Sequence, residues 1–97
     1  MTNKFRSINE VRDSIDKLDL EIIELISKRK DLVNEAVKLK TKDQIVDQKR
    51  IDEIIQRLSA LAERLDIPGK MVVNIWNCMI DGFIEYEKTN FEKIKKS

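Results

Sequence analysis

The chain has 97 residues, of which 41% are hydrophobic and 38% are charged, with only 2 Gly and 1 Pro. This length and composition indicate a single domain, residues 1–97, and exclude disorder and collagen-like repeats. The 19 basic and 18 acidic residues leave a formal net charge of +1. We therefore expect no nucleic-acid partner, because no basic field would attract one.

Features that the sequence lacks limit both the expected location of the protein and the reactions it could catalyse. No apolar run approaches the ~20 residues that span a bilayer, and Met1–Glu10 lacks the apolar core of a signal peptide. We therefore expect a cytoplasmic protein without a membrane partner. A single cysteine, Cys78, cannot form an internal disulfide, and there is no histidine. Serine-triad, cysteine–histidine and zinc chemistries are thereby excluded.

The spacing of apolar residues, three and four almost throughout, predicts an all-α fold of three helices. The first helix is expected over about residues 7–40. It opens on a capping box in which the Ser7 hydroxyl and the Glu10 carboxylate pair with amide donors. Its heptad seam consists of Ile8, Val11, Ile15, Leu18, Ile22, Leu25, Leu32, Ala36 and Leu39.

Residues 41–46 are polar and lack the apolar stripe, so we expect a loop there. A second helix, about residues 47–65, is expected to begin with Asp47 as its cap. Pro68 favours a new helical start, which predicts a third helix over about residues 68–94.

The first helix is too long for a compact monomer. At 1.5 Å per residue, about 33 residues extend about 50 Å, whereas a compact chain of this length has a radius of gyration of about 12–13 Å. The seam would stay exposed on one chain, which predicts an intertwined oligomer, most simply a homodimer. A coiled coil held by the same seam is the alternative.

Two cations lie on the inward face of this helix. Arg29 occupies a seam position between Leu25 and Leu32, and Lys40 follows about three turns later on nearly the same face. Together they could hold one small anion. Alternatively, Arg29 sets register, forms a salt bridge or reaches solvent, and Lys40 is solvated, with Lys38 and Lys42 as nearby substitutes.

Three further charged residues could either belong to a ligand site or be ordinary structural or surface charges. Arg12 lies about 25 Å from Arg29 along a straight helix, so it would reach the same ligand only from another subunit. Arg50 lies at the start of the second helix, where an exposed first-turn arginine is the simpler interpretation. Glu87 interrupts the aromatic stripe between Phe83 and Phe91. Its two interpretations are a buried, protonated carboxyl group that donates a hydrogen bond and a salt bridge to a lysine. Inward cations with one inward carboxyl and no nucleophile suit a small dianion that reacts without covalent catalysis.

The segments Val11–Asp19, Leu25–Arg29 and Lys38–Lys40 resemble the all-α class of chorismate mutase. The resemblance continues through Val46–Arg50 and Met79–Glu87 and covers roughly residues 7–90. This family also includes isochorismate pyruvate-lyases and aminodeoxychorismate mutases.

The resemblance implies an intertwined homodimer with two sites, each built from both chains, and a rearrangement of chorismate to prephenate that needs no cofactor. Arg12 of the partner subunit and Arg29 would grip the two substrate carboxylates. Lys40 would bind a carboxylate and the ether oxygen. Glu87 would donate a second hydrogen bond to that oxygen, for which it must be protonated, so activity would favour acidic pH.

Of the remaining site residues, two match roles known in the family and two depart from its pattern. Asp47 would orient the substrate hydroxyl, and Arg50 would help close the loop at the mouth of the site. Ile51 stands where many of the mutases carry Glu, and Phe83 is bulkier than the residue in some mutases. Ile51, together with the short loop between Lys40 and Arg50, favours the lyase, and Phe83 is a lesser departure in the same direction. Glu87 favours the mutase, because the lyases carry Gln there, and mutase activity is the commonest in the family. We therefore expect a chorismate mutase, with isochorismate pyruvate-lyase as the alternative and a helical dimerisation module as the non-enzymatic one.

Overall fold

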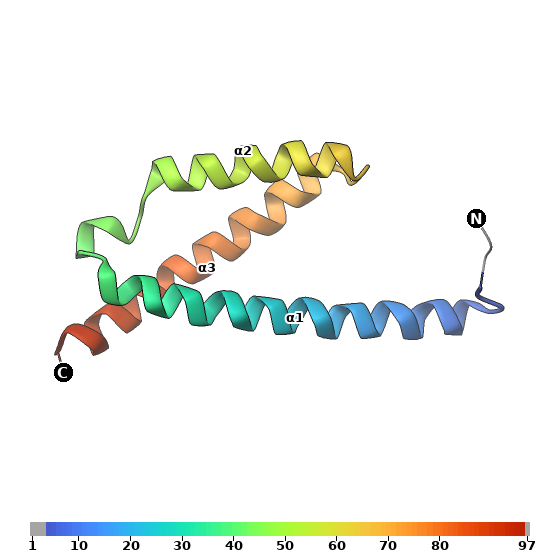
Figure 1. The fold of residues 1–97 in the computed structure, drawn as a ribbon, viewed down its shortest axis with the longest axis horizontal. Helices are drawn as coiled ribbons and strands as arrows, with labels where there is room; N and C mark the ends of the chain where they lie inside the picture. Colours follow the sequence, from blue (N-terminus) through green and yellow to red (C-terminus); the bar gives the residue numbers. More distant parts are fainter. Residues whose placement is uncertain (1–3, 97) are drawn as a thin grey trace. The chain divides into compact units, whose positions relative to one another are not determined.

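The computed structural model describes residues 4–96 of the chain, and the side chains of residues 4–93. It contains α1 (Ile8–Leu39), a 3₁₀ turn η1 (Lys42–Gln44), α2 (Gln48–Arg64) and α3 (Gly69–Lys96) (Figure 1). No strand occurs in this described part, which confirms the all-α fold of three helices. None of its helices is long and apolar enough to cross a membrane.

The chain divides into two compact units, which are described separately. The first ends at Leu32 and the second begins at Val33, so the division lies inside α1. In the first unit, Ser7 Oγ accepts a hydrogen bond from the Glu10 amide at 3.2 Å, and Glu10 Oε2 accepts one from the Arg6 amide at 2.6 Å. The expected side chains therefore cap α1, although Glu10 reaches back to Arg6, one residue before the cap.

The apolar seam of the first unit is exposed on the single chain. Its large members are 49% to 70% accessible, and they are Ile8, Ile15, Leu18, Ile22, Leu25 and Leu32. Isolated exposed apolar residues are ordinary in soluble proteins, but a continuous stripe of them marks an interaction surface. This part of α1 therefore depends on something else to cover it.

The second unit is built on the α2–α3 hairpin, whose two helices contact each other and diverge with distance from the turn that joins them (Figure 1). Its turn is a Schellman motif: the Ile67 amide donates to the Ala62 carbonyl at 2.9 Å and the Asp66 amide to that of Glu63 at 3.2 Å. Asp66 occupies the left-handed region at φ 57°. This geometry ends α2 and turns the chain into Pro68, directly before α3 begins at Gly69.

The core of the second unit differs from the expected seam at two places. Its buried apolar residues are Val37, Ile45, Ile54, Ala62, Val72 and Ile80. Val37 is fully buried whereas Leu39, which the heptad placed in the seam, is 87% exposed. A straight helix drifts about 20° per heptad relative to a 3.5-residue repeat, so the buried face has moved by the end of α1. Ile45 was expected in a polar loop, yet only 5% of it is exposed.

The segment between α1 and α2 is more ordered than a simple loop. The Thr41 amide donates to Gln44 Oε1 at 2.8 Å, and the Gln44 amide donates to the Thr41 carbonyl at 3.0 Å. These bonds form the η1 turn. Asp47 then caps α2, because its Oδ1 accepts a hydrogen bond from the Arg50 amide at 3.1 Å. The short connection thus presents Lys40 at the end of α1 and Ile45 to the core.

Candidate functional site

An ion pair joins the end of α1 to α3. Lys40 Nζ donates to Glu87 Oε1 at 2.8 Å, across 47 positions of sequence. Glu87 is 6% exposed and is the one charged residue that is buried in the described part of the chain. Removing a carboxylate from water is costly unless it is paired and hydrogen-bonded, so this burial requires the ammonium group of Lys40.

The position of Lys40 follows from the way α1 ends. Lys40 is the first residue after the helix and lies one turn beyond Val37, and its amide donates to the Val37 carbonyl at 3.4 Å. Because residues three apart share a helix face, the buried side chain of Val37 directs Lys40 toward the same neighbour. That neighbour is α3, which carries Glu87.

The Lys40–Glu87 pair can still bind a ligand through Lys40. An ammonium group carries three donors, of which one is used by Glu87, so Lys40 retains donors for an anionic or ether oxygen. The Lys40 side chain is 29% exposed and that of Glu87 is 8% exposed, so a ligand can reach the pair from the lysine side. Within residues 4–93, no three His, Cys, Asp or Glu side chains gather as ligands for a metal ion.

A second polar contact, which the sequence did not reveal, lies on the same faces of α1 and α3. Asn90 Nδ2 donates to Asn34 Oδ1 at 2.7 Å, and the bond is partly buried. A single asparagine in a helix is an ordinary surface residue, and nothing in the sequence relates two of them that lie 56 positions apart.

Asp47 and Arg50 lie at the start of α2, in the same unit as the ion pair. Both are exposed, and Asp47 already accepts the Arg50 amide as the helix cap. Within the described part of the chain, no hydrogen bond or ion pair joins either of them to Lys40 or Glu87. Their roles toward a substrate stay predictions.

The two residues that set this chain apart from many mutases lie at different places. Half-buried Ile51 lines a cavity of about 560 Å³ between α2 and α3, together with Ile55 and Asn77. Phe83 lies one turn before Glu87 on α3, and its ring meets that of Tyr86 edge-on, with centroids 6.1 Å apart and planes at 83°. Only Phe83 is therefore a near neighbour of Glu87 along a helix.

Arg12 and Arg29 belong to the unit that ends at Leu32 and are described within it. Arg12 is exposed and Arg29 is half-buried. The exposure of Arg12 leaves it accessible to a second chain. What the two arginines contribute to a site with Lys40 stays a prediction.

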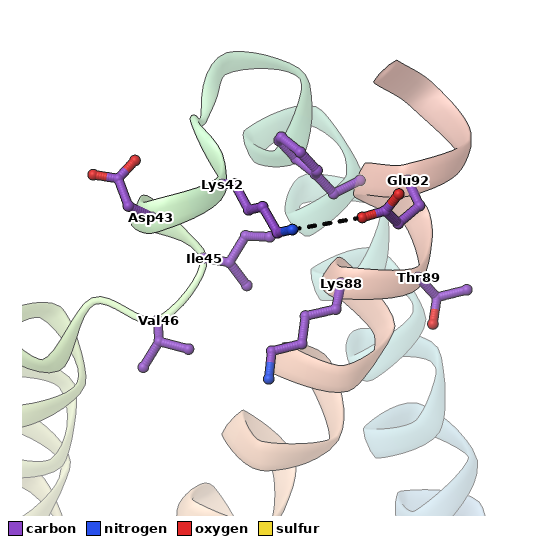
Figure 2. A pocket seen from close by; sticks show the side chains of 8 residues that line it. Lys42, Asp43, Ile45, Val46, Lys88, Thr89 and Glu92 are labelled. Atoms are coloured by element: carbon purple, nitrogen blue, oxygen red, sulfur yellow. Dashed lines mark ion pairs between the residues drawn. The ribbon is translucent and has the colours of Figure 1, made fainter. Parts of the chain in front are cut away.

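A cavity of about 530 Å³ opens between the η1 segment and α3, and neither Lys40 nor Glu87 lines it (Figure 2). Its lining residues are Lys42, Asp43, Ile45, Val46, Lys88, Thr89, Phe91 and Glu92. Figure 2 shows Lys42 reaching across toward Glu92, with Nζ and Oε1 4.0 Å apart, while Asp43 points away. Both members of this pair are largely exposed, so Lys42 takes part in a solvated surface pair, whereas Lys40 is paired with a buried carboxylate.

Comparison with known proteins identifies the family. No curated protein matches the chain in a sequence search. The sequence model of the family described as chorismate mutase type II matches residues 11–88. The matched range includes Arg12, Lys40 and Glu87 and covers most of the chain. The protein therefore belongs to the chorismate mutase type II family.

Proposed function

We propose that this protein is a chorismate mutase, which rearranges chorismate to prephenate. The observation that carries the proposal is the Lys40–Glu87 pair, a buried carboxyl group held 2.8 Å from a partly exposed ammonium group. In this reaction one ether C–O bond breaks as one C–C bond forms within the same molecule, and no proton or electron is gained or lost. Positioning and charge stabilisation therefore suffice, and no nucleophile is needed.

Lys40 has the property that this reaction requires. Negative charge develops on the ether oxygen as the C–O bond breaks, and a fixed ammonium group stabilises that charge most where water is largely excluded. Glu87 holds the ammonium group in place before substrate arrives. The remaining donors of Lys40 bind the ether oxygen and one substrate carboxylate.

Glu87 takes a second role once substrate is bound. A neutral carboxyl group can donate its proton in a hydrogen bond to the ether oxygen. The same side chain thus orients Lys40 in the free protein and acts as a donor in the complex.

The rest of the site requires a second chain. The exposed stripe of α1, at 49% to 70% accessibility, supports an intertwined homodimer in which two long helices cover each other. We propose that Arg12 of the partner subunit and Arg29 bind the two carboxylates of the substrate. Asp47 would orient the ring hydroxyl, and Arg50 would close the mouth of the site.

Isochorismate pyruvate-lyase is the second candidate, and Ile51 favours it. An apolar side chain at the start of α2 cannot accept a hydrogen bond from a ring hydroxyl, and Ile51 is half-buried beside apolar Ile55. In that reaction the corresponding ether C–O bond breaks while a ring hydrogen moves to the methylene carbon of the enolpyruvyl group, so that pyruvate leaves and the ring becomes salicylate. The Lys40–Glu87 pair would stabilise either transition state, so substrate choice depends on the residues around it.

Replacing Lys40 by Ala should lower kcat about 10²–10³-fold, roughly 3–4 kcal/mol of transition-state stabilisation. The physical reason is the loss of the one fixed cation beside the breaking bond. Lys38→Ala is the matched control, because Lys38 lies on the same helix end, is exposed and pairs only locally with Glu35 at 3.1 Å. Circular dichroism checks that each variant folds. Full turnover by a folded Lys40→Ala protein would exclude the proposed role.

The Glu87→Gln variant should have a flatter pH profile than the native chain. Only protonated Glu87 donates, so native activity should fall as pH rises, whereas the Gln amide donates at every pH. The variant should therefore exceed the native protein at neutral and alkaline pH. Glu85→Gln, an exposed change on the same helix, serves as the control. A profile that the Glu87 change leaves unaltered would show that Glu87 is not the donor.

Mixing two inactive variants tests whether Arg12 is contributed by the partner. Arg12→Ala and Lys40→Ala chains, refolded together in equal amounts, should regain about a quarter of native activity. The reason is that about half the dimers are mixed, and each mixed dimer has one intact site out of two.

The matched control for this mixing is Arg29→Ala with Lys40→Ala. Both of these residues come from the same chain in the proposed site, so every site stays damaged and no activity should return. Equal recovery in the two mixtures, or none in either, would contradict the proposed sharing of Arg12.

A further inference from the structure

The hydrogen bond between Asn34 and Asn90 connects the same two helices as the proposed catalytic pair. Asn90 Nδ2 lies 2.7 Å from Asn34 Oδ1, and both residues are half-buried. Asparagine is a poor helix former because its side chain competes for backbone hydrogen bonds. Two asparagines facing each other from two helices therefore require a compensating role in holding those helices together.

The geometry places this bond in one row with the ion pair. Asn34, Val37 and Lys40 follow one another at steps of three along the end of α1, and Glu87 and Asn90 are three apart on α3, so each set lies on one face. Asn34 meets Asn90 and Lys40 meets Glu87. The two bonds therefore bracket Val37, which is fully buried.

Val37 alone would not determine how the two helices align. Apolar contacts are non-directional, whereas a hydrogen bond between two partly buried amides forms only at one distance and orientation. In paired helices, a single buried asparagine can set the register. A slip of α3 by one helical turn, about 5.4 Å, would break the amide bond and separate Lys40 from Glu87.

We infer that Asn34 and Asn90 are positioning residues whose amide–amide bond fixes the register in which Lys40 meets Glu87. They act through the ion pair and do not touch the substrate. The structural part of this inference concerns the free protein. Its consequence for turnover rests on the proposed function.

Amide chemistry offers variants of unchanged size. Asn34→Asp keeps an acceptor for the Asn90 amide. Asn90→Asp also keeps the bond, because the Asn34 side chain can rotate and present its own NH₂ group. In the double variant two carboxylates face each other without a donor between them. The loss should therefore appear in the double variant and not in either single one.

The first measurement does not depend on catalysis. The coupling is the interaction free energy between the Lys40 and Glu87 side chains, measured by a double-mutant cycle. Urea unfolding of the starting chain, Lys40→Met, Glu87→Gln and the combined variant, at one fixed protein concentration, gives its value. In the native, Asn34→Asp and Asn90→Asp backgrounds we expect the pair to change the unfolding constant about tenfold, which corresponds to ~1.4 kcal/mol. In the Asn34→Asp/Asn90→Asp background the factor should fall to about twofold or less.

Two controls separate the loss of helix register from the effect of the two added negative charges. Asn74→Asp/Asn77→Asp adds the same two charges at exposed positions of α3 and should leave the coupling unchanged. Repeating the cycle in 0.5 M salt screens long-range repulsion, so a loss that persists there reports the broken register. Unaltered coupling in the Asn34→Asp/Asn90→Asp background would overturn the inference.

A second variant keeps the test decisive if the double Asp chain does not fold. Asn34→Leu/Asn90→Leu keeps the number and branching of side-chain heavy atoms and provides an apolar contact, but no directional bond. We expect it to fold and to lose most of the Lys40–Glu87 coupling. Coupling retained at its native value in this variant would equally overturn the proposed positioning role.

Turnover gives the last readout. The Asn34→Asp/Asn90→Asp variant should lose at least about tenfold in kcat, with KM changed less than about threefold, because only the transition-state contact is displaced. Native kcat in a variant whose coupling is lost would contradict the link to catalysis. If the native protein itself turns over no substrate, the proposed function fails, while the unfolding cycle still decides the positioning role.

Discussion

The burial of Glu87 beside Lys40 is the constraint on which the site depends. A carboxyl group that is 6% exposed requires a partner with good geometry, and the 2.8 Å bond to Lys40 Nζ supplies it. Lys40 is the first residue after α1 and lies about one turn beyond Val37, where its side chain meets Glu87 on α3. The cost of burying the Glu87 carboxylate is thus offset by a partner at the end of α1.

A single chain contains only part of the proposed active site. The ion pair and the start of α2 belong to the unit that begins at Val33, whereas Arg12 and Arg29 belong to the other unit. The exposed apolar stripe of α1 supplies a physical reason for a second copy to pair with it, because covering that stripe removes apolar surface from water. In the proposed dimer, the same pairing that covers the stripe brings a partner arginine to each site.

Much of the fold and part of the site could be predicted from sequence. Helical spacing, the Ser7 and Asp47 caps and the unusual positions of Lys40 and Glu87 are all local features. The burial of Val37 was missed because a heptad read over a long straight helix accumulates an angular error. The asparagine pair and buried Ile45 were missed because contacts between distant segments leave no periodic signal. For Glu87, the salt bridge to a lysine was one of the two interpretations, and the structure shows it in the free protein.

The most direct test of the account is a turnover assay of the purified protein on two substrates, across acidic to neutral pH. Prephenate formed from chorismate is followed in one reaction, and pyruvate with salicylate released from isochorismate in the other. The account predicts that prephenate formation dominates and is fastest at acidic pH. Dominant pyruvate release would show that the protein is a lyase, and absence of both activities would contradict the proposed enzyme.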